Sequence, residues 1–133
     1  MDLLGKSVTF QTDFFKPDPT ETEETNPNCY GKELALYLAE KLKERGVETQ
    51  KILPEDWGWI VMAFRKPFML WLGCSNIDES VDKWNIFIVA EIPIWRRFFK
   101  RIDPTQQINE LRLYLEEIVA QIPNISNKRW DLP

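Results

Sequence analysis

Six tryptophans are the most unusual side chains of this sequence, and two of them, Trp57 and Trp59, stand two positions apart. Because alternate residues of a strand point to the same side of a sheet, both rings are expected on one face. A tryptophan ring offers a large contact area at a small entropic cost, which is typical of protein-binding surfaces. The alternative that the sequence leaves open is that these rings belong to the core.

A second group that could bind a partner is the basic and aromatic segment 95–101. Its basic residues are Arg96, Arg97, Lys100 and Arg101. Charge combined with ring stacking could hold a phosphate, an anionic surface or single-stranded nucleic acid. The other interpretation is a strand-to-helix connection whose bases neutralise nearby acids. The net charge of −4 argues against general nucleic-acid binding, because such binding needs a broad basic surface.

A pocket with a reactive thiol is the third candidate, because Cys74 follows Gly73 at the end of a predicted strand. The residues that could line this pocket are Asp56, Arg65, Cys74 and Asn76. The chain contains no histidine, so neither a His-based catalytic triad nor a His-ligated metal site can form. The alternative interpretation is that the thiol is a small buried hydrophobe.

Metals and cofactors are not expected from the remaining motifs. Cys29 and Cys74 lack the CxxC spacing of structural zinc sites, and we expect both to be reduced thiols. No glycine-rich phosphate-binding loop occurs in the sequence. The adjacent acids Glu55 and Asp56 would point to opposite sides of an extended chain, so they do not form a catalytic pair.

The length and composition predict one globular domain over residues 1–133. The chain is 44% hydrophobic and 29% charged, and no run of 18 apolar residues predicts a membrane helix. The acidic excess lies in residues 1–30, whereas acids and bases balance in the remainder. Residues 16–28 are acidic and rich in proline and threonine, which predicts a long loop. We expect a cytoplasmic protein.

The apolar pattern predicts several strands and two helices. The predicted strands are 7–15, 47–53, 57–64, 68–72 and 84–92. The first helix is expected to start at Pro27 after an Asn26 N-cap and to end at Gly46. The second is expected to start at Pro104 after an Asp103 N-cap and to stop at Pro123. This order predicts an α+β two-layer sandwich, in which a mostly antiparallel sheet of about four to five strands carries both helices on one face.

Three segments resemble parts of small bacterial α+β proteins that have no established function. The segments are Pro54–Trp59, Trp71–Cys74 and Arg101–Pro104, and the resemblance covers most of residues 30–130. It implies a single domain in a bacterial cytoplasm. It implies no catalytic or binding residue.

Together these patterns favour a non-enzymatic domain that binds another protein, as an immunity or inhibitor protein does, or a second copy of itself. In that hypothesis Trp57 and Trp59 are apolar anchors, and the charged segments steer the encounter. A small-ligand-binding protein or a modest enzyme with its pocket near Cys74 is the second hypothesis. Weak binding of an anionic surface or nucleic acid through residues 96–101 is the third.

Overall fold

The computed structural model describes residues 6–93 and 103–131. The basic segment 95–101 therefore lies outside the described residues, and so do its predicted binding residues Arg96, Arg97, Lys100 and Arg101.

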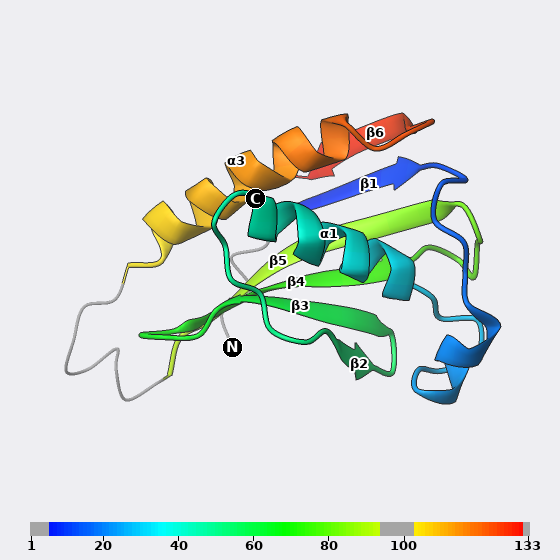
Figure 1. Cartoon of the computed structure of the whole chain (residues 1–133), viewed down its shortest axis with the longest axis horizontal. Coiled ribbons are helices and arrows are strands. Elements are labelled where there is room, and N and C mark those ends of the chain that lie inside the picture. The colour runs from blue at the N-terminus through cyan, green and yellow to red at the C-terminus, as the bar shows by residue number, and fades with distance from the viewer. Residues whose placement is uncertain (1–5, 94–102, 132–133) are drawn as a thin grey trace.

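Six strands form one antiparallel sheet within the described residues (Figure 1). They are β1 (Ser7–Gln11), β2 (Leu53–Glu55), β3 (Gly58–Phe64), β4 (Met69–Asn76), β5 (Lys83–Glu91) and β6 (Ser126–Asp131). Their order across the sheet is β2-β3-β4-β5-β1-β6, so β2 and β6 are the two edges. The α+β class with an antiparallel sheet is confirmed, and the expected four to five strands are too few.

The additional strand is β6, which the sequence pattern did not indicate. Its residues are exposed except for the half-buried Trp130, which pairs with Val8 of β1. An edge strand needs few apolar side chains, and charged residues there oppose pairing with other chains. A polar run such as Ser-Asn-Lys-Arg-Trp-Asp therefore carries no alternation that would reveal a strand.

The predicted strand 47–53 is wrong over most of its length, because residues 47–52 belong to no strand and the first of them, Val47, completes the end of a helix. The N–H of Val47 donates to the carbonyl of Leu42 at 3.0 Å, and Gly46 has a φ of 82°. This is the geometry of a glycine helix stop, which uses the backbone donors that a strand would need. Only Leu53 belongs to both the predicted strand and β2.

The two described α-helices are α1 (Lys32–Glu44) and α3 (Thr105–Ala120), which Figure 1 shows running over the sheet. Helix α3 starts one residue later than predicted: its N-cap is Pro104, which forms no side-chain cap hydrogen bond, and the carboxylate of Asp103 accepts hydrogen bonds from the backbone N–H and hydroxyl of Thr105. The Thr105 hydroxyl and N–H lower the pKa of Asp103. No described helix is long and apolar enough to cross a membrane.

The first helix starts five residues later than Pro27, the predicted position. Gly31 is its N-cap, and a Cβ at this position would lie 2.4 Å from the carbonyl oxygen of Cys74. The helix therefore begins in direct contact with β4, where only glycine fits. Residues 19–23 of the predicted loop form a short 3₁₀ helix, η1 (Pro19–Glu23).

Buried apolar side chains form two separate clusters. The main core contains every buried apolar residue of α1 and α3, together with residues of the sheet such as Val8, Trp59 and Leu72. The second cluster, which we call the aromatic patch, contains no helix residue. Its members are Trp57, Ile60, Met62, Trp71, Phe87 and Val89. In β3, consecutive residues alternate between the two clusters, as side chains on opposite sides of a sheet must.

Candidate functional site

The two tryptophans that were expected to share a face are on opposite sides of the sheet. Trp59 is only 3% exposed and packs in the main core, whereas Trp57 is half-buried and packs in the aromatic patch. Trp57 belongs to the turn between β2 and β3, so the two-residue alternation of a strand does not extend to it. The expectation of one shared face is therefore wrong, and Trp59 cannot contact a partner.

The indole of Trp59 is held by a buried carboxylate that the sequence analysis missed. Its Nε1–H donates to Oε1 of Glu21 at 3.0 Å, and Glu21 is 1% exposed. The same oxygen accepts from the N–H groups of Gly31 and Lys32, at 2.8 and 3.1 Å. The Glu21 charge thus meets the first N–H groups of α1, where a helix favours an anion.

The other oxygen of Glu21 closes a capping box at the start of η1. Oε2 accepts from the N–H of Asp18 at 3.0 Å, while Oδ1 of Asp18 accepts from the N–H of Thr20 at 2.9 Å. Asp18, Pro19 and Glu21 have the residue types and spacing of this motif, so the sequence did hold a signal for it. Glu21 therefore fixes the loop 16–28 onto α1 and β3, and this acid is not part of a solvated acidic cluster.

Three rings gather at the centre of the aromatic patch. The centroids of Trp57 and Trp71 lie 6.2 Å apart at an interplanar angle of 19°, and Phe87 lies 5.1 Å from Trp57. Phe87 rests directly on Gly73, because a Cβ at Gly73 would lie 2.1 Å from the ring. Glycine at this position of β4 thus makes room for the ring of the neighbouring strand.

The margin of the aromatic patch is apolar and acidic. Strand pairing places Leu53 opposite Ile60 and Met69 opposite Glu91, so these residues lie on the same side of the sheet as the patch. Leu53 is 43% and Met69 is 37% exposed. Glu55 and Asp56, exposed beside Trp57, and Glu91 on β5 supply negative charge. Among the strand residues that the structure describes, Lys83 on β5 and Arg129 on β6 are the basic residues of this side.

The four residues proposed for a thiol pocket are not brought together. Asp56 precedes β3 and Arg65 follows it, and seven residues of extended chain separate them by about 20 Å. Cys74 is fully buried, and burial raises the pKa of its thiol far above the usual range. The side chain of Asn76 is occupied, because its Oδ1 accepts from the N–H of Tyr30 and its Nδ2 donates to two backbone carbonyls.

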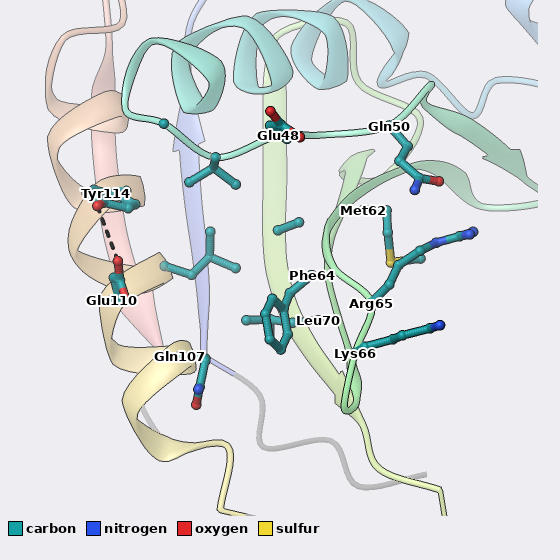
Figure 2. Close-up of a pocket in the computed structure, with 14 residues that line it drawn as sticks. Glu48, Gln50, Met62, Phe64, Arg65, Lys66, Leu70, Gln107, Glu110 and Tyr114 are labelled. Carbon is teal, nitrogen blue, oxygen red and sulfur yellow. Dashed lines mark hydrogen bonds between the residues drawn. The ribbon is translucent and has the colours of Figure 1, made fainter.

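A groove of about 580 Å³ forms elsewhere, between α3, the segment 46–50 and the turn between β3 and β4 (Figure 2). Arg65 is the only one of the four proposed pocket residues that lines it, and Lys66 lies beside it. On α3, the hydroxyl of Tyr114 donates to Glu110 at 3.3 Å, and the charge of Glu110 raises the pKa of Tyr114. Neither Cys74 nor Asn76 borders this groove.

Metal ligands do not gather anywhere in residues 6–93 and 103–131, where no group of three His, Cys, Asp or Glu side chains could hold an ion. Among the described residues, the sheet face with the aromatic patch and the groove beside α3 are the candidate binding surfaces. No protein-family model, curated protein or solved structure matches this sequence.

Proposed function

We propose that this chain is a non-enzymatic protein-binding domain that uses the aromatic patch as its contact surface. The observation that supports this most directly is the composition of the two clusters. All buried apolar residues of α1 and α3 pack in the main core, whereas the patch is built by strands and one turn alone. We infer a two-layer arrangement in which both helices cover one sheet face and the other face serves a partner.

The patch has the chemistry of an interface centre. Trp57 and Phe87 are half-buried and stacked on Trp71 and Gly73, so their rings are held in place before a partner arrives. Interfaces depend on a few such aromatic anchors, and preordered rings lose little entropy on binding. The exposed Leu53 and Met69 extend the apolar area at its margin.

The charge of the margin indicates which kind of partner fits. The margin of the aromatic patch carries the acids Glu55, Asp56 and Glu91. The whole chain has a net charge of −4. Complementary charges steer association and select orientation. The proposed partner is therefore a protein with an apolar anchor surrounded by basic side chains, which is the relation of an acidic inhibitor or immunity protein to a basic target.

The burial of Cys74 favours this function over the enzymatic hypothesis. A cysteine nucleophile must be accessible and must reach the thiolate state near neutral pH. The Cys74 thiol is enclosed in the main core, and burial raises its pKa, which keeps it protonated near neutral pH.

A photo-crosslinking residue placed at Leu53, compared with one at Leu113, tests the contact surface in host cells. Leu113 is 54% exposed on α3, so it is a matched apolar control on the helix side. We expect position 53 to crosslink to one discrete basic protein, and position 113 not to. Trp57→Ala should then weaken binding of that protein by at least about 30-fold, as truncated aromatic hot spots do.

The thermal unfolding of each variant is measured alongside its binding. Trp57 is half-buried at a turn, so Trp57→Ala should keep a cooperative thermal transition close to that of Leu113→Ala. Equal crosslinking from both positions would exclude the patch as the binding surface. If position 53 crosslinks only to a second copy of this chain, the patch mediates self-association, which would contradict the proposal of a separate partner.

A further inference from the structure

The groove beside α3 shares one residue, Met62, with the aromatic patch and has the size of a small-molecule site. Its volume of about 580 Å³ lies within the usual range for ligand pockets. It is enclosed by three different parts of the chain, namely α3, the segment 46–50 and the turn between β3 and β4. Figure 2 shows side chains from all three parts surrounding one space.

The floor of the groove is apolar and already packed. Leu70 and Leu111 are 2% and 4% exposed and belong to the main core. Phe64 lies beside them, and its ring packs against Phe68 with centroids 5.2 Å apart. A β-bulge between Met62 and Phe64 shifts the register there, so that Phe64 pairs with Leu70. An apolar group that enters the groove would therefore meet a preformed surface.

The walls carry opposite charges. Arg65 and Lys66 extend from the β3–β4 turn, and Figure 2 shows Glu110 on α3 across the groove from them. Glu48 adds a second acid from the segment after α1. Among the described residues, neither Arg65 nor Lys66 forms an ion pair. A ligand with only one sign of charge would be attracted by one wall and repelled by the other.

From its size, its apolar floor and its oppositely charged walls, we propose that the groove binds a zwitterionic small molecule with an apolar body, the chemistry of a short apolar peptide. Its carboxylate would face Arg65 and Lys66, and its ammonium group would face Glu110. Its apolar side chains would lie on Phe64, Leu70 and Leu111.

The dipeptide Leu-Phe is a suitable probe, and calorimetry or NMR titration measures its binding to the full chain. Two modified probes remove one charge each: N-acetyl-Leu-Phe lacks the ammonium group and Leu-Phe-amide lacks the carboxylate. Because partly exposed ion pairs contribute up to about 1 kcal/mol, each modification should weaken binding to the unmodified chain about fivefold.

Charge-neutral variants then identify which wall meets which end of the probe. Glu110→Gln should weaken binding of Leu-Phe about fivefold and should not weaken binding of N-acetyl-Leu-Phe, which it no longer repels. The double variant Arg65→Gln with Lys66→Gln should weaken binding of Leu-Phe and should not weaken binding of Leu-Phe-amide. All these side chains line the groove rim and are not in the core, so the variants should fold.

Matched controls separate this proposal from the protein-binding function. Lys51→Gln and Glu24→Gln change exposed charges outside the groove and should leave the affinity for Leu-Phe unchanged. Trp57→Ala should also leave it unchanged, because Trp57 does not line the groove and Met62, the patch residue that does, is not one of the residues proposed to bind the probe. The proposal is overturned by the absence of binding at millimolar Leu-Phe. It is equally overturned if the wall variants affect all three probes alike.

Discussion

Glu21 shows how one side chain can join three segments that are distant in sequence. Its two carboxylate oxygens accept hydrogen bonds from the 16–28 loop, from the start of α1 and from the indole of Trp59 on β3. A buried carboxylate is tolerated only when donors surround it, and here four N–H groups do so. The position of the loop therefore depends on this single residue.

Glu21→Gln should destabilise the protein by about 1–3 kcal/mol, because an amide nitrogen would replace an acceptor among these donors. Urea denaturation measures the change in the free energy of unfolding. Glu24→Gln is the matched control: it is exposed in the same loop and should stay within about 0.5 kcal/mol of the parent chain. Equal small effects for both variants would show that Glu21 does not hold the loop.

At the residue scale, the sequence predicted features that depend on residues close together in the chain. It did not predict features that depend on contacts between distant segments. The start of α3 could be recognised to within one residue, because Asp103 and Thr105 are only two positions apart and hydrogen-bond to each other. The placement of Trp57 and Trp59 depends on where the β2–β3 turn ends, which the alternation of apolar residues did not reveal. The burial of Cys74 depends on the start of α1 packing on β4, a contact between distant segments.

At the element scale, β6 illustrates an edge strand held by one side chain. Trp130 pairs with Val8 and packs against the main core, while its neighbours are exposed. The pairing with β1 also has a register shift between Thr9 and Gln11. A polar strand with one apolar anchor should be the least stable part of the sheet.

Trp130→Ala should release β6 without unfolding the central strands. Hydrogen exchange of the backbone amides measures this directly. The amides of β6 and those of β1 that face it should exchange faster by at least tenfold, because the variant loses an apolar contact of more than 1.4 kcal/mol. The amides between β4 and β5 should keep their protection. Unchanged exchange in β6 would mean that the backbone hydrogen bonds alone hold this edge.

At the scale of the whole molecule, the buried thiol couples stability to pH. Burial raises the pKa of Cys74 in the folded chain, whereas an exposed thiol in the unfolded chain titrates near pH 8.5. Below about pH 8.5 the thiol is neutral in both states and has no effect. Above it, only the unfolded chain ionises, so the free energy of unfolding should fall with rising pH.

The expected slope is about 1.4 kcal/mol per pH unit above pH 9, in addition to the contribution of other groups. Urea denaturation of the reduced protein at pH 8, 9 and 10 measures it. Cys74→Ala should lose this part of the slope, although its stability at pH 8 is lower. Cys29→Ala is the control and should keep the slope. The same pH dependence in Cys74→Ala and the parent chain would contradict the linkage.

The sequence by itself determined the α+β class, the second helix and the apolar central strands, because these follow from local spacing and from burial on both sides of a sheet. Only the tertiary structure decided the start of α1, the side on which each tryptophan lies, the existence of β6 and the groove beside α3. The physical reason is the same in each case. Glu21 with Gly31, Phe87 with Gly73, and Trp130 with Val8 are contacts between residues far apart in the chain, and no local pattern records which distant residue will supply the partner.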